Sequence, residues 1–255
     1  MGLAHVVVTV VNRDDLADGG ADHYRRCVDA IADRLPKVTI ELLSSDLAGD
    51  ERALEHLLTG APLSVFAHNV ECVPRLDAQV RDPRASFEQS LQVLRRSKQL
   101  RPELLTKSSI MVGVGETDAE VLGALVRLRE ADVDLVTLGQ YLQPGKRYLP
   151  IDRFVPPDTF AAWDEEARRL GFSAVASGPL VRSSYRAGLL LEEARTGRRL
   201  ALRPHEQTAS EVSTEHDSSD LRPDVVDVKI LAASAAALER DVDCESYDDQ
   251  QSEEN

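Results

Sequence analysis

The sequence predicts an α/β protein built around a parallel sheet, and three observations support this prediction. Its 255 residues, 42% hydrophobic and 29% charged, have the composition of an ordinary globular protein of one large or two small domains. Short β-branched runs alternate with segments of helical periodicity in residues 1–200. Polar stretches follow the predicted strands, and no Gly-rich phosphate loop follows the first strand. These loops favour a barrel, whose site lies at the carboxyl ends of its strands, over a doubly wound open sheet.

The strands are predicted from short apolar runs. Residues 4–11 (AHVVVTVV) are the clearest case, because a strand that is buried on both faces needs an almost continuous run of apolar residues. The same pattern predicts further strands at residues 38–43, 63–67, 108–112, 133–138 and 173–176.

Segments with helical periodicity separate these runs. In residues 83–100, Phe87, Leu91, Val93 and Leu94 recur at the spacing of one helix face, which predicts a long amphipathic helix. The other helices are predicted at residues 23–34, 51–58, 118–130, 157–170 and about 185–195.

The negative charge is concentrated at the end of the chain. Residues 206–255 hold 15 Asp and Glu against 3 Lys and Arg, whereas the remainder holds 29 against 27. A nearly neutral body permits small anionic or zwitterionic ligands. We therefore predict two regions, a barrel over residues 1–200 and an acidic, largely disordered tail over residues 201–255, in which residues 225–238 could form one helix or strand that docks on the body.

Neither a membrane segment nor a cysteine framework is predicted. The apolar run near the start is far too short to span a bilayer and no signal peptide precedes it, so a cytoplasmic location is expected. Cys27, Cys72 and Cys244 are widely separated, without the spacing of a disulfide framework, a zinc site or an iron–sulfur site.

Six polar stretches lie after or around predicted strands, where a barrel would place its site, and would meet at one rim. Each has a structural alternative: Asp14 and Asp15 could cap a helix, Thr117 could be an N-cap, and a lone His68 is more often structural than a ligand. Together their side chains suit a zwitterionic ligand with a ribose and an amino-acid part. The stretches are residues 12–20, 68–71, 106–109, 113–117, 139–144 and 177–185.

These stretches together resemble lipoyl synthase, a family of radical S-adenosylmethionine enzymes. The resemblance runs from Gly2 to about Ala194, and its motifs occur in the family's order and approximate spacing. They are HVVVT-x-V-x-RDDL-x-DGGA (residues 5–21), HN-x-E-x-VPRL (68–76), TKS-x-IMVG-x-GET (106–117), LGQYLQP (138–144) and SGPLVRSSY (177–185).

The resemblance implies a partial (β/α)6 TIM-like barrel of the radical S-adenosylmethionine type with two [4Fe–4S] clusters. One cluster would cleave S-adenosylmethionine to an adenosyl radical that abstracts hydrogens from C6 and C8 of an octanoyl chain. The second cluster would be consumed as the sulfur donor. The implied partners are an octanoylated lipoyl carrier domain or glycine-cleavage carrier protein and an electron donor, with neither a nucleic acid nor a membrane.

The same resemblance implies site residues. The cofactor and substrate cavity would be lined by Asn69, Glu71, Lys107, Gly115, Glu116 and Gln140. Ser184, with Ser183 as the alternative, would be a serine ligand of the auxiliary cluster, and Arg182 beside it could screen the cluster's charge or anchor the loop. A hard oxygen is a weaker partner for cluster iron than a thiolate, which suits a cluster that gives up sulfur.

The sequence departs from the family in its cysteines. The family's C-x4-C-x5-C and C-x3-C-x2-C sets lie upstream of the point where this chain begins, and its three cysteines cannot replace them. Cys72 stands where the family usually has Thr, and Ser109 where it usually has Gly. Residues 4–11 correspond to the family's second strand, so the first strand is expected to be absent and this edge to be exposed and prone to aggregation.

Three functional interpretations follow. The first is an incomplete or split lipoyl synthase, with its cysteine-bearing segment elsewhere or on a separate chain. The second is a non-catalytic relative that binds S-adenosylmethionine or a lipoyl carrier domain. The third, an unrelated barrel enzyme, is remote. Under the first interpretation, the chain alone assembles no [4Fe–4S] cluster.

Overall fold

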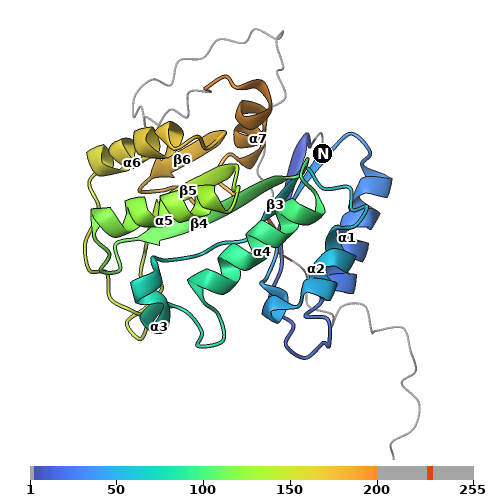
Figure 1. The fold of residues 1–255 in the computed structure, drawn as a ribbon, viewed down its shortest axis with the longest axis horizontal. Helices are drawn as coiled ribbons and strands as arrows, with labels where there is room; N and C mark the ends of the chain where they lie inside the picture. Colours follow the sequence, from blue (N-terminus) through green and yellow to red (C-terminus); the bar gives the residue numbers. More distant parts are fainter. Residues whose placement is uncertain (1–2, 200–228, 232–255) are drawn as a thin grey trace, which may run out of the picture.

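A computed structural model describes residues 3–199 and 229–231 of the chain. In these residues a single sheet of parallel strands carries the fold, and helices follow most of its strands (Figure 1). The strands are β1 (His5–Thr9), β2 (Thr39–Leu43), β3 (Val65–Ala67), β4 (Leu105–Val112), β5 (Leu135–Gln140), β6 (Ala174–Gly178) and β7 (Lys229–Leu231).

The helices and short helical turns lie between these strands. The α-helices are α1 (Ala21–Arg34), α2 (Glu51–Leu58), α3 (Asp77–Val80), α4 (Phe87–Leu100), α5 (Asp118–Glu130), α6 (Pro157–Arg169) and α7 (Ala187–Thr196), and the 3-10 turns are η1 (Leu47–Gly49) and η2 (Pro74–Leu76). This alternation confirms the predicted α/β class.

The sheet has the strand order β6-β5-β4-β3-β2-β1-β7, and every neighbouring pair is parallel. The carboxyl ends of all strands therefore meet at one edge of the sheet, where the polar stretches of the sequence follow them. All six residues of β5 are buried, as expected for a central parallel strand covered on both faces.

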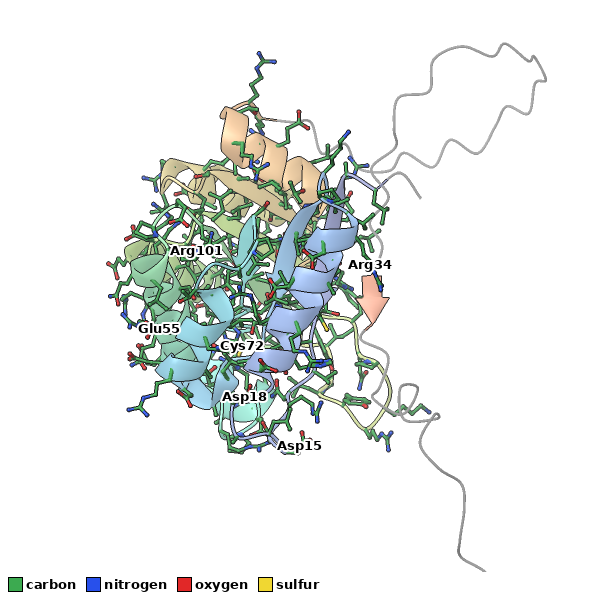
Figure 2. All side chains as sticks on the ribbon, turned by 90° about the vertical axis from the view of Figure 1, so that its right-hand side faces the viewer. Asp15, Asp18, Arg34, Glu55, Cys72 and Arg101 are labelled. Atoms are coloured by element: carbon green, nitrogen blue, oxygen red, sulfur yellow. The ribbon has the colours of Figure 1, made fainter. Side chains whose placement is uncertain are left out.

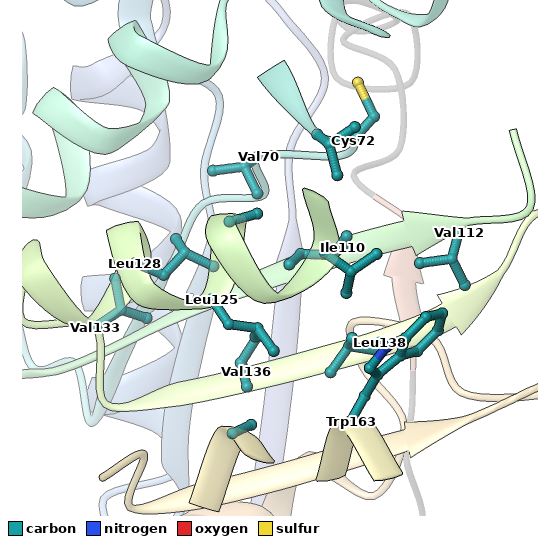
Figure 3. Close-up of a cluster of buried hydrophobic side chains, with 14 of the residues drawn as sticks. Val70, Cys72, Ile110, Val112, Leu125, Leu128, Val133, Val136, Leu138 and Trp163 are labelled. Carbon is teal, nitrogen blue, oxygen red and sulfur yellow. The ribbon is translucent and has the colours of Figure 1, made fainter. Parts of the chain in front are cut away.

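The main core lies between one face of the sheet and the helices. Figure 3 shows part of it, in which Ile110 and Leu138 from two strands pack with Leu125, Leu128 and Trp163 from α5 and α6. A second cluster packs β1, β2 and β3 against α1, α2 and α4. The opposite face of the sheet carries a smaller apolar cluster beneath α7, so this face is only partly filled by apolar side chains.

Helix boundaries follow from caps that the sequence contains. α2 and α5 occupy the predicted residues because the Asp50 and Thr117 side chains accept backbone N–H groups at their starts. α4 begins later than predicted, at Phe87, because Ser86 Oγ accepts the Gln89 N–H group at 3.1 Å. α1 rises from the loop that carries Asp15 and Asp18 (Figure 2), and Asp18, not Asp14 or Asp15, accepts the Gly20 N–H group.

The edge of β1 is not exposed along its whole length, which corrects the prediction for residues 4–11. β7 pairs with β1 in parallel, with Val7 opposite Lys229 and Thr9 opposite Leu231. β7 is the described part of the segment predicted at residues 225–238; the rest of the predicted acidic tail lies outside the described residues. An extra strand on an edge removes the unpaired backbone groups that promote aggregation. In the described part of the chain, no helix is long and apolar enough to cross a membrane.

Candidate functional site

A cavity of about 280 Å³ lies at the carboxyl ends of the strands β3 to β6. We call it the strand-end cavity. Four of the six polar stretches line it, through residues that include Asn69, Glu71, Ser109, Gln140, Arg182 and Ser183. This position, at the carboxyl ends of parallel strands, is where α/β sheets bind their ligands.

A second hollow of about 260 Å³ adjoins the strand-end cavity at the ends of β1, β2 and β3. We call it the Arg81 lobe; Asn12, Ser44, Asp46, His68 and Arg81 are among the residues that line it. Asn69 and Glu71 line both spaces and so form a wall that they share. The stretch at residues 12–20 reaches this lobe through Asn12.

The shared wall is held in place by backbone contacts with β4. Glu71 has a left-handed backbone (φ 66°), its N–H group donates to Ser109 O at 3.2 Å, and its carbonyl accepts the Met111 N–H group at 2.6 Å. Burial raises the pKa of Glu71, although Asn69 and Arg81 oppose this shift. The buried Asn69 Oδ1 has no hydrogen-bond partner. The wall therefore offers a polar group that a ligand could satisfy.

His68 has a structural role, which is the more common role of a lone histidine. Its Nδ1 lies 3.0 Å from Ser44 O and its Nε2 lies 2.9 Å from Ser90 Oγ. Burial lowers the pKa of the ring, which favours the neutral imidazole, and the ring joins two strand ends to α4.

Gln140 lines the strand-end cavity, but its side chain is engaged by the loop that follows β5. Its Nε2 donates to Tyr141 O at 3.1 Å and to Arg153 O at 3.0 Å, and its Oε1 accepts the Val155 N–H group at 2.9 Å. A Cβ at Gly113 would lie 2.1 Å from Gln140 Nε2, so only glycine leaves room for this contact.

Gly115 and Glu116 are not lining residues of either space. The Glu116 carboxylate is buried and accepts the N–H groups of Gly113 and Val114 at 2.8 and 3.0 Å, which closes its own turn. Thr117 and Glu120 form a capping box at the start of α5. The geometry therefore supports a structural role for residues 113–117, in which Thr117 is the N-cap of α5.

Lys107 lies on β4 but also lines neither space. Its Nζ is 2.7 Å from Glu41 Oε1, with both side chains 1% exposed, and His5 Nε2 lies 3.8 Å from Glu41 Oε2. Burial works against ionisation of Glu41, but Lys107 and His5 hold its pKa below the ordinary value. Lys107 is thus engaged in a buried ion pair.

The segment after β6 crosses over β5 at the cavity. A Cβ on Gly139 would lie 2.2 Å from Val181 O, so the close crossing requires glycine. Arg182 Nη1 donates to Val181 O at 2.7 Å and to Gln140 O at 3.2 Å, which anchors this loop. Ser183 lines the cavity, whereas Ser184 is buried and does not.

Arg81 is the site residue that the sequence analysis did not single out. Its side chain is only 7% exposed, it lines the Arg81 lobe, and its Nη2 donates to Ser90 Oγ at 3.0 Å. No motif marks it, since its surroundings come from segments that are distant in the sequence. A lone Arg after a short helix carries no local signal for burial.

The described residues do not fit an iron–sulfur cluster. Cys27 lies on α1 beside His23, and Cys72 is buried with its Sγ 3.7 Å from Asp77 Oδ1. Burial raises the pKa of the Cys72 thiol to about 12, which opposes the thiolate that metal binding needs. Among the residues that the structure covers, no group of three or more His, Cys, Asp or Glu could hold a metal ion.

The parallel strand order and the cavity at the strand ends define a partial α/β barrel with its candidate site at the carboxyl ends of the strands. A solved methylornithine synthase, PylB, shares the fold with a TM-score of 0.51 at 17% identity, over 67% of this chain and 48% of that one. The chain matches no family model.

Sequence identity is more specific. The chain is 58% identical to the lipoyl synthase of Halorhodospira halophila over 192 residues, which are 75% of this chain and 57% of that protein. It is 50% identical to the mitochondrial lipoyl synthase of Bos taurus over 187 residues, 73% of this chain and 50% of that protein. The chain is thus similar to lipoyl synthases over about three quarters of its own length, and it spans about half the length of these relatives.

Proposed function

We propose that this chain provides the barrel of a lipoyl synthase, an enzyme that inserts sulfur at C6 and C8 of an octanoyl chain on a lysine of a carrier protein. The observation that carries the proposal is the gathering of family motifs at one cavity. Asn69 and Glu71, Gln140, and Arg182 come from three separate motifs, and all of them line the strand-end cavity.

The two adjoining spaces fit S-adenosylmethionine as the cofactor. Ser44 Oγ and Asn69 Oδ1 are buried without partners at the lobe and at the shared wall, and such groups are costly unless a ligand satisfies them. In this chemistry S-adenosylmethionine is the source of the radical that takes hydrogen from the octanoyl chain. The chain's own residues bind and orient the cofactor and substrate, with Asn69 and Glu71 between the two spaces.

The other predicted site residues act through positioning in this proposal. Gln140 and Glu116 fix the backbone of the loops around Gly113, and Lys107 neutralises the buried carboxylate of Glu41. Such supporting contacts matter because a small misplacement of reacting groups lowers rates strongly.

The [4Fe–4S] clusters do not fit the described residues, so no step is assigned to them on this chain. The three cysteines of the sequence lack a cluster spacing. We propose that the ligating cysteines and the electrons come from outside this sequence, through a separate cysteine-bearing segment and an electron donor.

Of the two serines that the family resemblance offers as a cluster ligand, Ser183 is the one that lines the cavity, and we propose it over Ser184 for a cluster whose cysteines come from the other segment. Ser183 lines the strand-end cavity beside Arg182, whereas Ser184 is 7% exposed and lies outside the lining. Leu142 and Leu180, 46% and 77% exposed, are on loops at this cavity and offer apolar contacts to a carrier protein. The cytoplasmic location stays a prediction.

The proposal is tested by adding a cysteine-bearing segment to this chain and measuring sulfur insertion. The 255-residue chain is purified anaerobically, alone and with the cysteine-bearing N-terminal segment of the Halorhodospira halophila lipoyl synthase, and both samples are reconstituted with iron and sulfide. An octanoyl-lysine peptide, S-adenosylmethionine and a chemical reductant are added, and the products are measured by mass spectrometry. We expect no cluster and no product from the chain alone, and peptide carrying two sulfur atoms from the pair.

A stoichiometric cluster on the chain alone would contradict the proposal. Cluster assembly and S-adenosylmethionine binding by the pair, with no sulfur insertion, would instead indicate a non-catalytic relative. The Ser183→Ala and Ser184→Ala variants, compared in the same assay, test the serine assignment: Ser183→Ala is expected to abolish product and Ser184→Ala to retain it.

A further inference from the structure

β1 lies next to the outer edge of the sheet, although its sequence is that of an interior strand. Its residues 5–8 (HVVV) are between 1% and 7% exposed. Edge strands are commonly protected by Lys, Pro or a bulge, whereas β1 contains neither Lys nor Pro and its register with β2 runs without interruption. A buried apolar run of this kind is typical of the interior of a parallel sheet. The sequence of β1 therefore indicates a strand partner on the side that faces away from β2.

β7 occupies this side of β1 and forms the outer edge of the sheet (Figure 2). It covers β1 incompletely. β1 pairs with β2 through all five of its residues, whereas only residues 7–9 pair with residues 229–231 of β7. On the β7 side, His5 and Val6 have no strand partner among the described residues. A strand of five residues would therefore form a longer ladder with β1 than β7 does.

The pairing of β7 with β1 is weak for a second reason, which is the length of its connection. Residues 200–228 lie between the end of the described body and β7. Closing a long connection costs chain entropy, and each backbone hydrogen bond of a three-residue pairing contributes only a small net stability. A partner that forms a longer ladder can therefore replace β7.

The direction of β7 defines which kind of strand can replace it. β7 is parallel to β1, as are all other neighbouring strands of the sheet. A strand that took its place in this direction would end beside Thr9, at the edge of the sheet that carries the Arg81 lobe and the strand-end cavity. The residues that follow such a strand would reach the candidate site. This route suits a segment that has to bring cysteine ligands to that edge.

We propose that β7 occupies the binding site of a strand from the cysteine-bearing segment, and that this strand displaces β7 from β1 when the segment joins the barrel. This inference rests on the proposed function, which supplies that segment. The C-terminal part of the chain then competes with the segment for the same edge. It covers the backbone groups of β1 in the free chain and inhibits assembly until the segment is present.

The first test weakens the pairing of β7. In Ile230→Pro/Leu231→Pro, two adjacent residues lose their N–H groups, and one of the two faces β1 because adjacent N–H groups of a strand point in opposite directions. The full chain and this variant are titrated with the fluorescently labelled cysteine-bearing N-terminal segment of the Halorhodospira halophila lipoyl synthase, and fluorescence anisotropy measures binding. The variant is expected to bind roughly 5- to 30-fold more tightly, which corresponds to one or two hydrogen bonds lost by the competing strand.

Gln250→Pro/Gln251→Pro is the matched control, since it introduces two prolines near the end of the chain but outside residues 229–231. It is expected to bind the segment within about twofold of the unmodified chain, because the fraction of chains with an open β1 edge does not change. Circular dichroism of each variant checks the fold. Equal affinities of the unmodified chain and Ile230→Pro/Leu231→Pro would overturn the inference.

Hydrogen exchange shows directly whether the strands replace each other, and it needs no variant. In the free chain, the amides of residues 229–231 that pair with β1 are expected to exchange slowly. In the complex with the segment they should exchange fast, while residues 5–9 stay protected. Sulfur insertion by a pair in which residues 229–231 stay protected would overturn the inference and leave the proposed function intact. If no form of the chain binds the segment, the proposed function itself fails.

Discussion

Lys107 and Arg81 are two buried cations near the same cavity, and their surroundings differ. Lys107 is 1% exposed and has the Glu41 carboxylate at 2.7 Å, and it lines neither the strand-end cavity nor the Arg81 lobe. Arg81 is 7% exposed, lines a cavity, and has free donors on Nη1. Burial of a charge therefore does not identify a binding residue. A better indication of a binding residue is a buried polar group that lacks a hydrogen-bond partner and lines a cavity.

The contrast predicts opposite costs for the two residues. In the Lys107–Glu41 pair the opposite charges are in direct contact, although Glu41 Oε2 has no hydrogen-bond partner. Such a pair belongs to the fold, because removing one member leaves the other charge without compensation. Arg81 has its nearest carboxylate at 3.9 Å, beyond hydrogen-bond distance, so we expect its removal to cost less in unfolding free energy. Sites that bind ligands are commonly less than optimal for stability.

The largest expected effect is that of Lys107→Met. It leaves Glu41 buried without its cation, and we expect a loss of about 3–5 kcal/mol in the free energy of unfolding. Urea unfolding followed by the fluorescence of Trp163, which is 3% exposed, measures the loss. The double variant Glu41→Leu/Lys107→Met should recover most of it. A loss below 1 kcal/mol for Lys107→Met would remove the distinction between the two cations.

A smaller effect is expected at the crossing beside Arg182. Gly139→Ala places a Cβ 2.2 Å from Val181 O, so the loop must shift, at a cost of about 1–3 kcal/mol in unfolding free energy. Because Arg182 is anchored through Gln140 O and Val181 O, the shift also moves the rim of the strand-end cavity. Thermal unfolding measures the cost; the control Gly123→Ala, with open space at its Cβ, should not lower stability. Equal stabilities for both variants would contradict the close crossing.

The sequence predicted the order of elements and their approximate bounds. Residues 51–58 and 118–130 were predicted as the structure has them, because Asp50 and Thr117 are local caps next to apolar periodicity. The bounds of β4 and β5 were less accurate, since pairing with neighbouring strands extends a ladder beyond its apolar run. β7 depends on a pairing with β1 across the whole sequence, which no local pattern indicates.

The site was predicted less completely than the fold. Asn69, Gln140 and Arg182 line the strand-end cavity, because the carboxyl ends of parallel strands share one edge; their binding roles stay predictions. The side chains of Glu116 and Lys107 could not be placed, since their partners are set by loop conformation and by a strand far along the chain. Arg81 was missed for the same reason: Ser90, His68 and Ser44 come together only in the fold.

A pH comparison sharpens the difference between the two charge environments through Glu41 and Glu71. Lys107 and His5 lower the pKa of Glu41, so its contribution to stability is present above the unfolded pKa of about 4.3 and is lost as pH falls toward the lowered value. Burial raises the pKa of Glu71, so its folded form binds more protons. Its contribution is present below about pH 4.3 and is lost as pH rises through the raised value.

Unfolding free energies measured between about pH 3 and pH 7 test these opposite slopes. Relative to the unmodified chain, Glu71→Gln should flatten the decline on raising pH, by about 1.4 kcal/mol for each unit by which the folded pKa is raised. Glu41→Gln should flatten the decline on lowering pH. Parallel pH profiles for the two variants would contradict the assigned environments.

The smallest expected effect on stability is that of Arg81→Gln, and it is the strictest test of the comparison. The change removes one hydrogen bond to Ser90, which keeps its contact with His68, and it also removes a cation with unused donors. These terms oppose each other, so we expect the unfolding free energy to change by less than about 1 kcal/mol in either direction. The same urea titration as for Lys107→Met measures it. A loss as large as that of Lys107→Met would make Arg81 a structural residue like Lys107.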